Sequence, residues 1–170
     1  MNFASIIFIS YIYLYVVRIS DMTEQCPNFT TIHLHDCQWV HYLNIQSDKL
    51  QSVTISACPE ITSLALDSPA LSAFSVNGCL RLASVVVKAG EMLQSAAIVA
   101  CGRLEKVEIV SEGLQQLRML ELMNMSSVAL TAPSLRCILW VYYHQLHCFI
   151  AYSTVRFQRD VVIATHLNMT

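Results

Sequence analysis

Cysteine and histidine are the side chains here best suited to bind a metal or attack a substrate, and the 170 residues hold seven cysteines and six histidines. Four cysteines follow one another at separations of 21, 21 and 22 residues, at Cys37, Cys58, Cys79 and Cys101. In a stack of repeats they would form a ladder of buried thiols that fill space and donate weak hydrogen bonds to the turns. Stacked neighbours come close enough for a disulfide, but their parallel Cβ vectors oppose one. We therefore expect reduced structural cysteines and a reducing compartment.

No group of residues has the spacing of a metal site. His33 and His35 would share one face of a strand, but the neighbouring repeat offers only the hydroxyls of Thr54 and Ser56 opposite them. Residues 144–148 are His-x-x-His-Cys, and no second pair of cysteine or histidine residues completes four ligands. We expect no metal and no other cofactor.

Catalytic patterns are also missing from the sequence. Nothing places a cysteine beside a histidine in a pocket, as a nucleophile and its base require. A β-solenoid that cleaves carbohydrates needs two carboxylates on one face, whereas Asp67, Glu108 and Glu121 belong to different repeats. We expect a protein that is not an enzyme, with a β-solenoid carbohydrate-active enzyme as the less favoured alternative.

The ladder cysteines end a repeated phrase that must position them. Residues 50–58 are Leu-x-x-Val-x-Ile-x-x-Cys, residues 71–79 repeat this pattern, and residues 61–66 carry a second phrase, Ile-x-x-Leu-x-Leu. On a helix the first and third apolar positions would lie about 140° apart, whereas on a strand the last two point the same way. The phrases therefore predict short strands, centred on His33, Asn44, Thr54, Ala65, Ser75, Val86, Ala97, Glu108, Glu121, Ala129 and Leu139.

Repeats of this length predict a stacked structure, because a single unit cannot bury its own apolar side chains and neighbouring units can cover them. The phrase matches the leucine-rich-repeat signature, with cysteine where many repeats carry asparagine. The return leg repeats the strand phrase instead of forming a helix, so we expect a flat, straight stack. The predicted fold class is an all-β, leucine-rich-repeat-like solenoid with two parallel sheets and a coil of about 21 residues.

The predicted solenoid covers residues 26–140, with every proline and glycine of this region at a corner. The pattern loosens after Ile109. We expect residues 110–116 to form a longer connection and Met125 to take the place of the ladder cysteine.

Composition restricts the partners of this solenoid. Apolar residues make up 55% of the chain, charged residues 13%, and the net charge is −2, so no basic stripe for nucleic acid is present. An unknown protein ligand is the partner we expect, on the outward face of the leading strands. An ordinary solvated face is the alternative. The centre of this possible partner-binding face is the row His33, Thr54, Ser75, Ala97 and Glu121.

The two ends of the chain differ from the solenoid. Residues 1–25 begin with an apolar segment, and residues 3–17 are a possible signal or membrane anchor, an N-terminal strand or a non-native start. Residues 141–170 form an apolar tail without the repeat, and neither end has a polar cap, so we expect a fragment or truncated product. Sequons at Asn28, Asn124 and Asn168 matter only for a secreted protein.

Residues 58–87 and 130–140, with Ser-Pro-Ala-Leu at 68–71 and Ala-Pro-Ser-Leu at 132–135, resemble the solenoid of F-box/leucine-rich-repeat proteins. The resemblance extends over residues 26–140. It implies substrate recognition in a Skp1–cullin–F-box ubiquitin ligase and a cytoplasmic or nuclear location. The F-box has no counterpart in residues 1–25, so a Skp1-type adaptor is expected only if a longer parent protein carries one. The alternative is a secreted or membrane-anchored recognition module.

Overall fold

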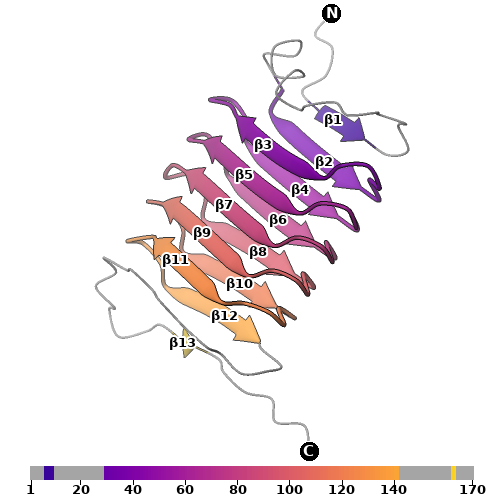
Figure 1. The fold of residues 1–170 in the computed structure, drawn as a ribbon. Helices are drawn as coiled ribbons and strands as arrows, with labels where there is room; N and C mark the ends of the chain where they lie inside the picture. Colours follow the sequence, from indigo (N-terminus) through magenta and orange to yellow (C-terminus); the bar gives the residue numbers. More distant parts are fainter. Residues whose placement is uncertain (1–5, 10–28, 142–161, 164–170) are drawn as a thin grey trace, which may run out of the picture.

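The computed structural model of the chain describes residues 6–9, 29–141 and 162–163, and these form strands and turns without a helix. The chain winds through two parallel sheets, and successive strands from β2 to β12 alternate between them (Figure 1). The eight-stranded sheet, called sheet A, has the order β1-β2-β4-β6-β8-β10-β12-β13, and the five-stranded sheet B has the order β3-β5-β7-β9-β11. The predicted all-β solenoid of two parallel sheets with a coil of about 21 residues is therefore confirmed.

The strand boundaries follow the repeated phrases. Sheet A contains β1 (Ile6–Ile9), β2 (Thr31–His35), β4 (Ser52–Ser56), β6 (Ala73–Asn77), β8 (Ser95–Val99), β10 (Gln116–Leu120), β12 (Cys137–Val141) and β13 (Val162–Ile163). Sheet B contains β3 (Tyr42–Gln46), β5 (Ser63–Ser68), β7 (Ser84–Ala89), β9 (Lys106–Ser111) and β11 (Ser127–Thr131).

Each strand from β2 to β11 alternates buried and more exposed side chains, as expected of extended chain with one apolar face. In β4, Val53 and Ile55 point between the sheets and are 0% and 1% exposed, while Thr54 lies on the outer face. Their branched side chains suit a pleated surface. The same alternation in sheet B supplies the other half of the core.

Corresponding residues of successive coils stack in register. Val53 on β4 pairs with Phe74 on β6, which pairs in turn with Ala96 on β8. In sheet B, Val85 on β7 pairs with Val107 on β9. Parallel strands lie about 4.8 Å apart, so each buried side chain contacts its equivalents above and below and the core is continuous along the stack.

The corner that follows each strand of sheet A from β2 to β10 contains a residue with left-handed backbone. One of the five is glycine, Gly78, and the others are Asp36, Ala57, Ala100 and Glu121, with φ between 51° and 57°. A non-glycine residue in this conformation costs roughly 1–3 kcal/mol. At the first four corners the conformation lets the backbone N–H donate to the next coil, with Asp36 N–H bonding to Ser56 O at 3.1 Å. The corner thus extends the backbone hydrogen bonds between adjacent strands of sheet A by one residue.

The opposite corners approach one another so closely that two of them require glycine. A Cβ on Gly90 would lie 2.5 Å from the Pro69 carbonyl oxygen, and one on Gly113 would lie 1.8 Å from that of Glu91. Every glycine and proline of residues 29–141 lies outside a strand, as predicted.

The predicted strand centre at Glu121 is wrong, because β10 ends at Leu120 and its central residue is Arg118. Residues 114–122 keep the 21-residue spacing as Leu-x-x-Leu-x-Met-x-x-Leu, so Leu122, and not Met125, follows Cys101 in the ladder position. Met125 instead begins the next return phrase. The expected long connection at residues 110–116 is also wrong. The one extra residue lies between β7 and β8, where three residues, 90–92, separate Ala89 from Leu93, compared with two in the next coil.

Only small parts of the two ends fall within the described residues. Ile6–Ile9 form β1 and pair with β2, so these four residues of the predicted segment 1–25 are a strand. The other residues of that segment, most of the tail at 141–170 and the sequons at Asn28 and Asn168 lie outside the described residues. Within the described part, no helix is long and apolar enough to cross a membrane.

The buried core predicts opposite outcomes for two aspartate substitutions. Val85→Asp places a carboxylate where the side chain is 0% exposed, and should destabilise the fold by on the order of 3–5 kcal/mol. Ala97→Asp, on the outer face of β8, should change the free energy of unfolding by less than about 0.5 kcal/mol. Urea denaturation followed by circular dichroism measures both values, and equal effects would contradict the assigned faces.

The glycine corners give a second matched pair. Gly113→Ala forces the backbone of Glu91 to move and should lower the free energy of unfolding by about 1–3 kcal/mol. Gly102→Ala meets no atom within 4 Å and should have almost no effect. A thermal melt of both variants tests this, and a stable Gly113→Ala protein would show that the corners are less tightly stacked than described.

Candidate functional site

The four predicted ladder cysteines lie one above another at the end of the sheet A strands and are buried, with 8% exposure for Cys37 and 0% for the other three. Each thiol donates to the backbone carbonyl oxygen two residues earlier, at sulfur–oxygen distances of 3.6, 3.3, 3.7 and 3.4 Å. None of the four forms a disulfide, and neither does Cys137, within the part of the chain that the structure describes. The ladder is therefore reduced and packs the corner, as predicted.

The environment of the ladder holds most of its thiols in the protonated form. Burial, with a contribution from Cys58, raises the pKa of the Cys37 thiol to about 11. A hydrogen bond with the Cys101 thiol, together with burial, raises the pKa of Cys79 to about 11. Cys58 is shifted in the same direction by Cys79 and by burial, whereas the hydrogen bond with Cys79 lowers the pKa of Cys101. Because the thiolate is the reactive form, a buried and protonated thiol is a poor nucleophile.

The predicted partner-binding face is the outer face of sheet A. The strand pairing aligns His33, Thr54, Ser75 and Ala97 in one row across β2, β4, β6 and β8, as expected. The next residue of this row is Arg118, which pairs with Ala97. Glu121 does not belong to the face, since it occupies the left-handed corner after β10. This end of the row therefore carries a guanidinium and not the predicted carboxylate.

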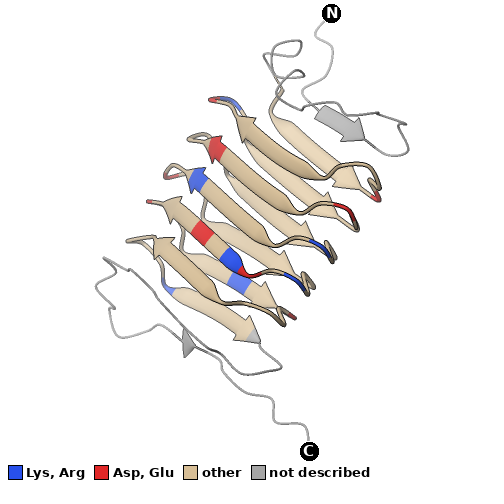
Figure 2. Cartoon of the chain, viewed as in Figure 1, with Lys and Arg blue, Asp and Glu red and all other residues tan. Residues whose placement is uncertain are grey.

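Arg118 is the only lysine, arginine, aspartate or glutamate on the described strands of sheet A. Sheet B differs, because Asp67, Lys88, Lys106 and Glu108 lie on its strands (Figure 2). Most of the other charges lie at the corners. The outer face of sheet A is therefore nearly uncharged, and on its central strands β4, β6 and β8 it consists mainly of small and hydroxyl-bearing side chains.

The two histidines of β2 do not form a metal site. His35 Nδ1 lies 2.9 Å from Ser56 Oγ, which in turn donates to the Leu34 carbonyl oxygen at 3.4 Å. His33 lies one row away, beside Thr54. Among the residues that the structure describes, no three histidine, cysteine or carboxylate side chains gather where they could hold a metal ion. The segment 144–148 lies outside the described residues.

No two of the three candidate carboxylates lie on adjacent strands, as the paired acids of a carbohydrate-cleaving site would require. Asp67 is the last residue but one of β5, and Glu108 lies near the middle of β9, with β7 between these two strands of sheet B. Glu108 forms an ion pair with Lys106 at 3.4 Å. Glu121 lies at a corner of sheet A.

Two serines that the sequence analysis did not identify stabilise the corner between sheets B and A. Ser68 and Ser111 are 0% exposed. Ser68 donates to the Leu50 carbonyl oxygen at 2.7 Å, and Ser111 donates to that of Gly90 at 2.9 Å. Their position two residues after Leu66 and Ile109 of the return phrase was the available signal, because it continues the alternation of inward-pointing residues by one step.

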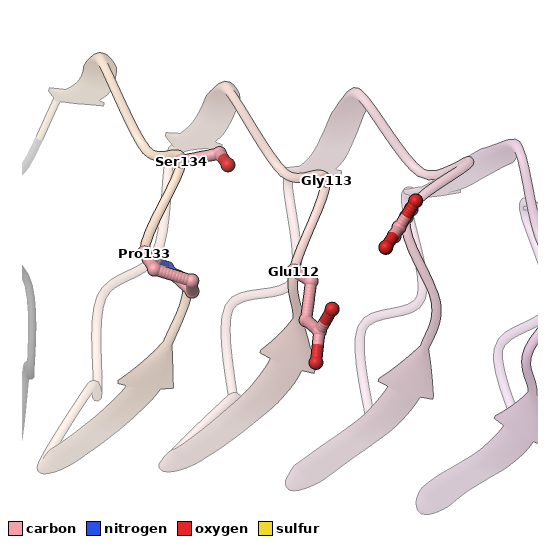
Figure 3. Close-up of a pocket in the computed structure, with 5 residues that line it drawn as sticks. Glu112, Gly113, Pro133 and Ser134 are labelled. Carbon is pink, nitrogen blue, oxygen red and sulfur yellow. The ribbon is translucent and has the colours of Figure 1, made fainter.

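The same corner carries an open recess of about 380 Å³, lined by Glu91, Glu112, Gly113, Pro133 and Ser134. Figure 3 shows Glu112 and Ser134 on successive coils, and the hydroxyl of Ser134 points toward the coil that carries Gly113. Glu91 and Glu112 are both exposed. The recess thus offers two exposed carboxylates and one hydroxyl, and none of its lining residues is a histidine, cysteine or lysine that could act as a base or an activated nucleophile.

Comparison of the chain with protein-family models, with curated proteins and with solved structures finds no match. The geometry of the described residues leaves two surfaces as candidates for binding: the outer face of sheet A and the exposed side chains at the corners. The ladder cysteines support both, because they pack the corners that follow β2, β4, β6 and β8.

The thiol ladder predicts a loss of stability at alkaline pH. The unfolded chain releases the protons of Cys37 and Cys79 near their ordinary pKa of 9.0, whereas the folded chain keeps them until about 11. The stabilisation is therefore complete below about pH 8 and is lost as the pH rises through 11, by on the order of 1–2 kcal/mol for each thiol.

Urea denaturation at a series of pH values measures this fall in the free energy of unfolding. In Cys79→Ser the hydroxyl can still donate to the corner but does not titrate in this range, so the fall should be smaller. An identical fall in this variant would show that other groups cause it.

Proposed function

We propose that this chain is a non-catalytic, protein-binding solenoid of leucine-rich-repeat type whose partner binds the outer face of sheet A. The observation that carries the proposal is the charge distribution. One guanidinium, that of Arg118, is the only formal charge on the described strands of sheet A, whereas sheet B carries both signs. Because the centres of protein interfaces are depleted in charged residues, sheet A fits a binding face better than sheet B.

The side chains of this face are suited to close contact along the backbone of a partner. Thr54, Ser75 and Ala97 are small, and all three are partly exposed. Small side chains allow a second backbone to approach, and the hydroxyl groups offer hydrogen bonds in a regular row. Large aromatic anchors are missing from this row, so the binding energy should be spread over many weak contacts.

The resemblance to F-box/leucine-rich-repeat proteins supports a more specific role. In such a protein the solenoid would hold the substrate of a ubiquitin ligase, and a Skp1-type adaptor would bind an F-box in a longer parent protein. The free, buried thiols support a reducing compartment, and therefore a cytoplasmic or nuclear location. No cofactor is needed for this role.

Site-specific photocrosslinking tests the proposed face. A photoreactive phenylalanine analogue at Ser75, on the outer face of sheet A, should form a discrete protein adduct in a lysate of cells that express the chain. The matched control is the same analogue at Val86, on the outer face of sheet B, which should not. Thr54→Arg, adjacent to Ser75, should reduce the adduct at least about tenfold, equivalent to 1.4 kcal/mol.

Adducts at Val86 alone, or adducts at Ser75 that do not respond to Thr54→Arg, would contradict the proposal. The identity of the adduct then tests the ligase role, because a ligase substrate should accumulate when the chain is deleted from the cell.

A further inference from the structure

At one corner between sheets A and B, two exposed apolar side chains stand on either side of a glycine with open space above it, and this space is called the notch. The residue after each ladder position lies at the surface of this corner, and on three successive coils these residues are Leu80, Gly102 and Met123. Leu80 is 60% exposed and Met123 is 58% exposed. They lie two coils apart, about 10 Å at the spacing of parallel strands. Gly102 between them has no side chain, so the gap is wide enough for one apolar side chain.

The fold itself does not require glycine at position 102. Gly78 has a φ of 67°, and Gly90 and Gly113 have no room for a Cβ. Gly102 differs from all three, because its φ is not positive and a Cβ would have no neighbour within 4 Å. Its missing side chain creates the notch without serving the packing of the chain.

An uncompensated positive charge lies beside the notch. The next residues along the corner are Glu60, Arg81 and Arg103 on successive coils. Arg81 donates to Glu60, which also lies 4.0 Å from His41. No ion pair among the described residues includes Arg103. Its neighbour in the stack, Arg81, carries the same charge. Like charges on adjacent coils repel, so a carboxylate from outside would stabilise this position.

The opposite corner of the solenoid carries a matching pair of side chains. Met92 is 63% exposed, and Glu91 before it is also exposed. Both belong to the connection of residues 90–92, which has one residue more than its counterpart in the next coil. Nothing in the packing of the core requires the extra residue, since Ala89 pairs with Ser111 and the stack continues from Leu93 in register.

The two features lie at the same level of the stack, because both flank β8. Met92 precedes Ser95, the first residue of β8, by three residues, and Gly102 follows Val99, the last, by three. If two copies lie side by side with their sheets in line, Met92 of one copy faces Gly102 of the next. At its corner Glu91 lies on the sheet B side of Met92, and at the other corner Arg103 lies on the sheet B side of Gly102. Glu91 of one copy therefore faces Arg103 of the next.

We propose that the chain associates side by side with a second copy of itself, with Met92 of one copy in the notch between Leu80 and Met123 of the next and Glu91 paired with Arg103. The flexible thioether suits an apolar gap of irregular shape. The contact joins two different corners, so it is heterologous and leaves one free notch and one free Met92 at the ends of a row. The outer faces of both sheets stay uncovered, and each row presents several copies of sheet A to a multivalent partner.

Sedimentation velocity of the full chain over increasing concentration, up to about 1 mM, tests the association. The sedimentation coefficient should rise with concentration and fall when salt screens the Glu91–Arg103 pair. Gly102→Leu, which fills the notch, should weaken association at least about tenfold without lowering the melting temperature. Asp48→Arg, an exposed charge change at the same corner but two coils away from Glu91, is the control and should leave it unchanged.

A charge exchange makes the test specific. Arg103→Glu and Glu91→Arg should each abolish association alone, because each places like charges together. Mixed in equal amounts, the two variants should associate again, since every contact between unlike variants joins opposite charges. A monomer at all concentrations, association unaffected by Gly102→Leu, or a mixture that fails to recover would overturn the proposal. Binding on sheet A can still occur in each of these cases, so the two proposals fail separately.

Discussion

The structure depends on branched apolar side chains stacking in register between two parallel sheets. Val53, Phe74 and Ala96 follow one another on sheet A, and Val85 and Val107 do so on sheet B. A coil that returned one residue early would turn its apolar side chains to solvent, because side chains alternate along a strand. The need to bury them therefore fixes the coil length near 21 residues. Where a coil has an extra residue, as at residues 90–92, that residue lies at a corner.

The corners meet this requirement by different chemical means on the two sides. At the end of each sheet A strand from β2 to β10, a left-handed residue turns the chain, and at four successive corners a thiol packs beneath it and donates to the strand end. On the other side Gly90 and Gly113 allow close approach, and the buried hydroxyls of Ser68 and Ser111 satisfy carbonyl groups of the preceding coil. Met92 and Gly102 lie at the corners but make none of these contacts themselves. It is at such positions, and on the outer faces, that binding can be varied without cost to the core.

Much of this arrangement could be predicted from the sequence because two periods agree. The alternation along each strand and the recurrence of the cysteines place β2 to β9 and bury the ladder thiols without other information. The agreement fails at β10, where Leu122 replaces cysteine and the run from Met119 to Met125 offers apolar residues in two registers. The predicted strand was centred three residues too late, on Glu121 instead of Arg118. The prediction therefore put a negative charge at the end of the binding row where the structure has a positive one.

The corner features were not predictable by the same logic. Whether a glycine is needed depends on its φ and on the distance to the neighbouring coil, which composition does not give; Gly102 and Gly113 look alike in the sequence and differ completely in their surroundings. Likewise, the exposure of Leu80, Met92 and Met123 follows from the path of each turn and not from hydropathy.

Nuclear Overhauser effects between methyl groups test the in-register stack most directly. The account predicts strong effects between residues 21 or 22 apart, such as Ile55 with Val76 and Val85 with Val107, because these side chains lie on paired positions of adjacent strands. Effects confined to residues three or four apart in the sequence, with none at the coil spacing, would indicate helices and contradict the solenoid.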